Sequence, residues 1–299
     1  MDLTVFQVDA FTTMPFQGNP AGVVLNADGL SEHHMQQIAR ELNNSETAFI
    51  FNRPTDEYEI EVRFFTPTKE VPICGHATIA SHYVYAKEHG IDQGIIRQKT
   101  KAGILPVEIV QEDHDLRIIM TQAAIKFGKT LDEAEIDLLV RGLRLRHDDL
   151  DRSLPIQIVS TGHSKVMVPI KSKAVLDAIR INETHLCELS ALIACNGFYT
   201  FSFDTQERDV LVCGRIFAPA IGIAEDPVTG NANGPLGAYL TRCHRIKQQH
   251  DGFTFTIAQG EAMRRKGYMN VHVYSSEKEA ELIKISGRAC IVFKTTISM

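Results

Sequence analysis

No apolar run in the sequence approaches the ~20 residues that a membrane-spanning helix needs. The opening decapeptide MDLTVFQVDA has an acid at position 2 and lacks the basic region and the long apolar core of a signal peptide. Basic blocks are also absent, because 37 acidic residues outnumber 31 lysines and arginines and the net charge is −6. These absences argue against a membrane partner, secretion and a nucleic-acid surface. We therefore expect a cytoplasmic protein.

Signatures of metal and nucleotide binding are missing as well. The six cysteines form no C-x-x-C pair and no zinc-site spacing, and the twelve histidines include no H-E-x-x-H motif. Neither a Walker loop nor a G-x-G-x-x-G motif is present. We expect reduced cysteines and no metal or other cofactor. What is present is 299 residues of ordinary globular composition, enough for one large or two medium domains.

Two stretches of the chain resemble one another, VRFFTPTKEVPICGHATIASHYV at 62–84 and GRIFAPAIGIAEDPVTGNANGPLGAYL at 214–240. Both contain Arg-x-Phe-x-Pro followed by Gly-x-Ala. The second copy has three more residues between its proline and its glycine, and we place the acid pair Glu225 and Asp226 in this extension. The resemblance continues upstream and downstream, so one copy fills each half of the chain.

Each half has the coarse pattern β-β-α-β-β-α-β-β-β. Many strands and two helices predict a curved, mostly antiparallel sheet around a central helix. We expect a mixed α/β fold of two pseudo-symmetric domains, residues 1–125 and residues 126–287. A C-terminal strand at 288–299 can complete the first domain, and the charged helical pattern at 131–154 predicts a linker helix in the second.

The matched loops end at Gly75 and Gly230, and each glycine precedes a predicted helix. A helix start presents unpaired N–H groups and about half a unit of positive charge, and glycine lets an anion approach closely. Small-molecule sites favour domain interfaces. If both loops face one cleft, they can hold a carboxylate. The alternative is that each glycine simply caps a core helix.

Polar residues that differ between the copies are the candidates for chemistry. Glu46 stands where the second copy has Gly197, and it precedes a largely apolar strand. Burial there would favour the protonated carboxyl, which suits general acid–base catalysis near neutral pH. The alternative is an exposed acid in a turn. The other differing pairs are Cys74 against Thr229 and His76 against Asn231.

The motifs FQVDAFT, PFQGNPAGVV, SETAFI, RFFTPTKEVPICGHAT and EDPVTGNANGPLGAYL together resemble the PhzF-like family of phenazine-biosynthesis isomerases. The resemblance runs from the first residues to the last strand, and it is greatest to bacterial members without an assigned substrate. It implies the diaminopimelate-epimerase-like fold, a cofactor-independent isomerase acting on a small carboxylate, and a homodimer.

The resemblance also implies roles for individual residues. Glu46, in the S-E-T motif, matches the glutamate that moves a proton in the phenazine enzyme. His76 and Asp226 match its catalytic partners. The substrate-binding positions that it implies are Asn19, Ser45, Cys74, Gly75, Thr229, Gly230 and Asn231.

Two departures from related enzymes leave alternatives open. Epimerases and racemases of this fold use a cysteine from each half, whereas the second position here is Thr229, which disfavours two-thiol racemisation. Asn231 replaces the usual serine of the phenazine enzymes, which weakens the assignment of a dihydro-3-hydroxyanthranilate substrate. Besides the Glu46 isomerase, the alternatives are an amino-acid racemase or epimerase that uses Cys74 with Glu46, and a non-catalytic metabolite-binding protein.

Overall fold

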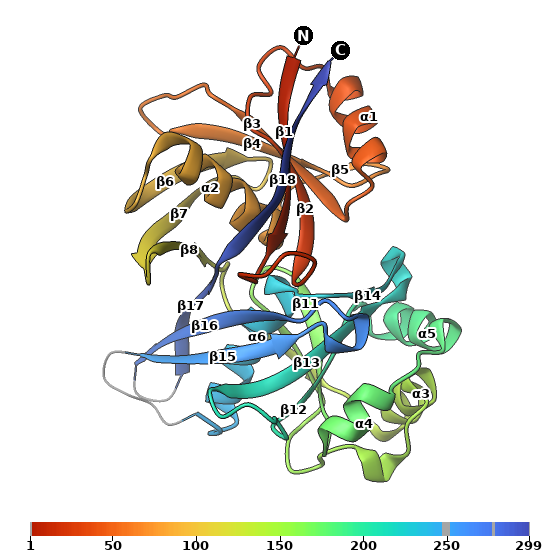
Figure 1. Ribbon diagram of the computed structural model, residues 1–299. Coiled ribbons are helices and arrows are strands. Elements are labelled where there is room, and N and C mark those ends of the chain that lie inside the picture. Colours follow the sequence, from red (N-terminus) through yellow and green to blue (C-terminus); the bar gives the residue numbers. More distant parts are fainter. Residues whose placement is uncertain (1, 247–251, 277–278, 299) are drawn as a thin grey trace. The chain divides into compact units, whose positions relative to one another are not determined.

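The computed structural model describes residues 2–246, 252–276 and 279–298 (Figure 1). The chain forms two compact units, of which unit 1 comprises Met1–Thr121 with Ser286–Met299 and unit 2 comprises Gln122–Ile285. Within the described ranges, no helix is both long enough and apolar enough to cross a membrane.

Unit 1 is a sheet that surrounds one helix. Its strands lie in the order β18-β1-β2-β3-β4-β6-β7-β8, with the short β5 beside β4. Only the pairs β2/β3 and β4/β6 are parallel. The elements are β1 (Asp2–Ala10), β2 (Asn19–Val24), α1 (Glu32–Leu42), β3 (Glu46–Phe51), β4 (Ile60–Phe65), β5 (Glu70–Val71), α2 (Gly75–His89), β6 (Gly94–Thr100), β7 (Gly103–Glu112), β8 (Asp115–Thr121) and β18 (Ala289–Ser298).

The two ends of the chain meet in unit 1. Strand β18, blue in Figure 1, runs antiparallel to the red β1. Strand β17 (Glu279–Gly287) carries the chain across the boundary from unit 2 back to unit 1. The first unit is therefore closed by residues that are nearly 300 positions apart in the sequence.

Helix α2 is the central helix of unit 1. It packs against strands at both ends of the sheet, including β1, β2, β3, β7, β8 and β18. Ten of its 15 residues are buried, because apolar and small side chains cover its whole circumference. By contrast, α1 buries only Met35, Ile38 and Ala39 and so lies on the outside of the sheet. The first turn of α2 is thereby fixed inside the unit, next to the start of β3.

Unit 2 repeats the arrangement. Its strands lie in the order β9-β10-β11-β12-β13-β15-β16, with β14 beside β13. The parallel pairs are again the third with the fourth strand and the fifth with the sixth. The elements are β9 (Lys126–Thr130), α3 (Glu133–Leu143), β10 (Gln157–Ser160), β11 (Ser164–Pro169), α4 (Lys173–Ala178), α5 (Glu183–Ile193), β12 (Phe198–Ser202), β13 (Val210–Ala218), β14 (Ile223–Asp226), α6 (Gly230–Arg242), β15 (Phe253–Gln259) and β16 (Gly267–Ser276).

Helix α6 takes the central place of α2 in unit 2, and it packs against β10, β11 and β16. The helix predicted at 131–154 is shorter than expected. It begins after the capping box of Asp132 and ends at Leu143, because Arg144 adopts a left-handed backbone with φ 53°. It packs against α5 and belongs to the core of unit 2.

Candidate active site

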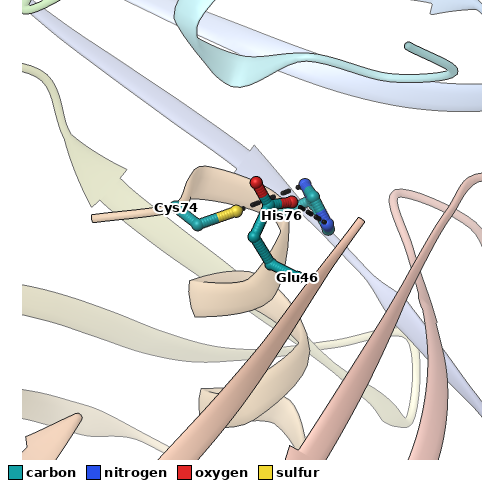
Figure 2. A group of neighbouring side chains, drawn as sticks. All are labelled: Glu46, Cys74 and His76. Atoms are coloured by element: carbon teal, nitrogen blue, oxygen red, sulfur yellow. Dashed lines mark hydrogen bonds and ion pairs between the residues drawn. The ribbon is translucent and has the colours of Figure 1, made fainter. Parts of the chain in front are cut away.

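Three side chains that the sequence singled out lie together in unit 1: Glu46, Cys74 and His76 (Figure 2). His76 Nε2 lies 3.4 Å from Oε2 of Glu46, and His76 Nδ1 lies 3.5 Å from Sγ of Cys74. The imidazole thus contacts the carboxyl group through one nitrogen and the thiol through the other. The three groups form a carboxyl–imidazole–thiol cluster.

Strand register and helix position bring the cluster together. Glu46 opens β3 and pairs with Ala21 of the parallel strand β2. Cys74 is the N-cap residue of α2 and His76 is the second residue of that helix. Because α2 packs against both β2 and β3, its first turn lies beside the start of β3. Glu46 and His76, which are 30 positions apart in the sequence, are therefore neighbours in the fold.

His76 is neutral at physiological pH. Burial lowers the pKa of its imidazole to about 4, and a hydrogen bond with the backbone carbonyl of Pro20 offsets this only in part. Because the imidazole is neutral, its 3.4 Å approach to Glu46 is a contact and not an ion pair. A neutral imidazole keeps one donor and one acceptor nitrogen, so it can pass a proton or orient a neighbour.

Glu46 is the member of the cluster that a ligand can reach. Its side chain is 17% exposed, compared with 7% for that of His76, and Cys74 is also buried. A partly exposed carboxyl beside a neutral imidazole suits general acid–base catalysis. The buried thiol at the helix start can serve as a second proton carrier through the imidazole.

The same three residues also offer S, N and O atoms that lie within 4.8 Å of one another. These are metal-ligand types. However, the thiol approaches Nδ1 while the carboxyl approaches Nε2. A single ion can use only one of these nitrogens, so the observed contacts suit proton transfer better than coordination.

The candidate residues of unit 2 form a second group, at the start of α6. Thr229 is the N-cap residue, and its hydroxyl donates to Oδ2 of the half-buried Asp226. Gln259 Nε2 donates to the Asp226 carbonyl at 3.0 Å, and Gln259 Oε1 accepts from Asn233 Nδ2 at 2.9 Å. Hydrogen bonds therefore fix this loop.

Gly230 and Asn231 are the first two residues of α6. A Cβ atom at Gly230 would collide with Cδ1 of Ile285, which would have to shift to make room. Asn231 is half-buried. That these residues share one cleft with Gly75 stays a prediction.

Glu225 does not belong to the extension in the second copy, which corrects the sequence alignment. Arg215 forms a bidentate ion pair with Glu225, with both N···O distances at 2.8 Å. Arg63 forms the same pair with Glu70 in unit 1, at 2.7 and 2.6 Å. Glu225 is thus the counterpart of Glu70 and has a structural role.

The alignment that follows is E-V-P-I-C-G against E-D-P-V-T-G, without a gap. The three extra residues lie earlier, around the 3₁₀ turn Pro219–Ile221. Strand pairing agrees, because Phe64 pairs with Val71 and Ile216 pairs with Asp226. Asp226 therefore replaces an apolar residue of the first copy, which strengthens its candidacy.

The remaining candidates lie at the edges of the unit 1 cluster. Asn19 opens β2 and is fully buried, and Pro20 after it supplies the carbonyl that bonds His76. Ser45 directly precedes Glu46 and is exposed. Sequence reasoning missed Pro20 and Gln259. The role of Gln259 depends on the pairing of β13 with the distant β15, and no local pattern could have revealed it.

A model of the phenazine biosynthesis-like protein family (PhzC-PhzF) matches residues 8–295. The chain belongs to this family. An uncharacterized isomerase from Clostridium acetobutylicum is 52% identical over 293 residues, covering 98% of this chain and 97% of the relative. An uncharacterized isomerase from Escherichia coli is 45% identical over 291 residues, covering 97% and 96%. With such relatives, this chain is an isomerase of the family, and the non-catalytic alternative is not supported.

A more distant relative has a named substrate. The trans-2,3-dihydro-3-hydroxyanthranilate isomerase of Pseudomonas aeruginosa is 29% identical over 280 residues, covering 94% of each chain.

Solved structures confirm the predicted fold class. A PhzF-family protein from Bacillus anthracis matches with a TM-score of 0.89 and 34% identity over all of both chains. A hydroxyproline epimerase from Agrobacterium vitis matches with a TM-score of 0.63 at 11% identity, covering 100% of this chain and 93% of the other. At that identity the likeness concerns the fold alone, the diaminopimelate-epimerase-like fold.

Proposed function

We propose that the chain moves a proton on a small carboxylate metabolite, without a cofactor, and that Glu46 is the acid–base group. The observation that carries the proposal is the contact between the partly exposed Glu46 carboxyl and the buried, neutral His76. Family membership supports it, because a relative at 29% identity is named as an isomerase of a hydroxyanthranilate-type acid.

The proposed step is a proton shift. The Glu46 carboxylate takes a proton from one carbon of the substrate, and the electrons of that C–H bond form a new double bond to the adjacent atom. The π electrons of the original double bond shift to its far atom, where the carboxyl returns the proton. Substrate and product are isomers, so neither an oxidant nor a co-reactant is needed. Burial keeps His76 neutral, and in this step its imidazole positions the carboxyl group.

The same proposal gives Asp226 a catalytic role. It assigns substrate binding to Thr229, Gly230 and Asn231. Asp226 is supported by its position, since it replaces Val71 of the first copy and is held by Thr229. The backbone N–H groups at the start of α6 are suited to a carboxylate. The homodimer implied by the sequence resemblance stays a prediction.

A second candidate function is racemisation or epimerisation by Cys74 together with Glu46. The contact of 3.5 Å between the thiol and Nδ1 of His76 favours it, because a neutral imidazole can take up the thiol proton. Thr229 at the matching position of unit 2 disfavours the version with two thiols.

The position of deuterium separates the two candidates. Trans-2,3-dihydro-3-hydroxyanthranilate, L-proline and trans-4-hydroxy-L-proline are each incubated with the enzyme in D2O, and products are identified by NMR and chiral chromatography. The proposal predicts deuterium at a migrated position, with a modest effect of Cys74→Ser. Exchange at Cα with inversion, abolished by Cys74→Ser, would establish the racemase instead. Acids recovered unchanged throughout would leave neither candidate supported among these compounds.

A further inference from the structure

Unit 2 holds a half-buried lysine, Lys165, beside the repeat position of the catalytic candidate Glu46. Gly22 pairs with Thr47 in unit 1, and Val166 pairs with Phe198 in unit 2. One residue earlier on each strand, Ala21 stands beside Glu46. By the same register, Lys165 stands beside Gly197.

The lysine side chain fills the place that the missing acid leaves. A Cβ atom built on Gly197 would lie 2.9 Å from Cε of Lys165, and still closer to Cδ. The lysine stem therefore lies directly over the glycine, and a side chain at position 197 would displace it from this place. In unit 1 the two neighbours are Ala21 and the acid Glu46. In unit 2 the equivalent neighbours are the base Lys165 and Gly197.

Lys165 forms no ion pair with a carboxylate of the described residues. Its Nζ donates to the carbonyl of the adjacent Ser164 at 3.1 Å. The Asp226 carboxylate and the Cys195 thiol influence it electrostatically, while His163 is a further titratable neighbour. Asp226 offsets the cost of withdrawing this cation from water only in part, and a bound anion would relieve the rest.

We propose that Lys165 binds the carboxylate of a small organic acid in unit 2. The proposed function supplies only the expectation that the ligand is a small carboxylate, and in that respect the inference rests on it. Lys165 is only half-buried, and Asp226 can accept a hydrogen bond from an amino or hydroxyl group of the same ligand. Burial lowers the pKa of Lys165, which is the electrostatic signature of an ammonium group that gains from an added anion.

Calorimetric titration with sodium malonate tests the proposal. We expect Lys165→Met to weaken malonate binding at least about tenfold, as expected for loss of a charge-assisted hydrogen bond. Lys171→Met removes an exposed lysine of the same unit and should leave the affinity within about twofold of wild type.

Gly197→Ala provides a second test that keeps the charge. The new methyl group would push the flexible lysine stem aside, so affinity should fall while the melting temperature changes little. Wild-type affinity in Lys165→Met, or no binding of millimolar malonate by the wild-type protein, would overturn the proposal. Glu46→Gln should still bind malonate, so loss of the Glu46 mechanism would leave this result untouched.

Discussion

Acidification should destabilise the protein through two buried histidines of α2. Burial lowers the pKa of both His76 and His82 to about 4, from an ordinary value near 6.5. Between these pH values the unfolded chain binds more protons than the folded chain. The stability contribution is therefore complete above pH 6.5 and is lost as the pH falls towards 4.

The magnitude follows from the size of the shift. Lowering the pH to 5 passes through about 1.5 of the 2.5 pKa units, and each unit is worth about 1.4 kcal/mol, so each histidine should cost about 2 kcal/mol of unfolding free energy. Nδ1 of His82 approaches the Thr78 carbonyl at 3.0 Å, while its Nε2 lacks a hydrogen bond to any described residue. A proton on Nε2 of His82 would therefore have no hydrogen-bond acceptor among the described residues.

Urea unfolding at pH 7 and pH 5 measures the effect. His82→Gln should lose about 2 kcal/mol of the pH-dependent difference, whatever its stability at pH 7. His33→Gln, at an exposed histidine, serves as the control and should behave like wild type. An unchanged pH-dependent difference in His82→Gln would refute the assignment of the acid sensitivity to this buried ring.

Three further results are expected. Arg215→Met should lower the unfolding free energy by about 3–5 kcal/mol, because it leaves the half-buried Glu225 without its partner. The control Arg53→Met, at an exposed ion pair, should cost at most about 1 kcal/mol. Equal losses of unfolding free energy in chemical unfolding would contradict this. Gly237→Ala should cost about 1–3 kcal/mol, since its Cβ would lie 2.7 Å from Cγ1 of Val271, and an unchanged melting temperature would disprove the close packing. Alkylation of Cys74 by iodoacetamide should be slow in the folded protein, and rapid labelling found by mass spectrometry would contradict its burial.

The order of elements could be predicted from the sequence because it depends on local patterns. Arg-x-Phe-x-Pro and Gly-x-Ala occur in both halves, and the structure pairs the strands around them in the same way. The fold class followed from the family motifs and is confirmed by the solved structures.

The exact alignment of the copies could not be predicted. The gap was placed next to Glu225 because turn residues around Pro219 carry no fixed pattern. Strand register, which depends on pairing across the sheet, decides the matter and assigns Glu225 to Arg215. The helix end at Leu143 was missed for a related reason, since Arg144 gives no sign of a left-handed backbone.

The candidate residues could be named from the sequence, but their contacts could not. Glu46, Cys74 and His76 were each singled out as residues that differ between copies. Which nitrogen of His76 meets which neighbour depends on how α2 packs against β2 and β3. Lys165 was overlooked because a single lysine near the start of an apolar strand resembles an ordinary surface residue.

The central claim is that Glu46 moves the proton. The most direct measurement is the rate of deuterium incorporation from D2O into a turnover substrate, compared among the wild type, Glu46→Gln and the exposed control Glu41→Gln. Glu46→Gln preserves shape but cannot exchange a proton, so its rate should fall ~10²–10⁴-fold while the protein still folds and binds ligand. Glu41→Gln should retain the wild-type rate. A Glu46→Gln enzyme that incorporates deuterium as fast as wild type would contradict the account. The acid–base role would then have to be assigned to Cys74, His76 or Asp226.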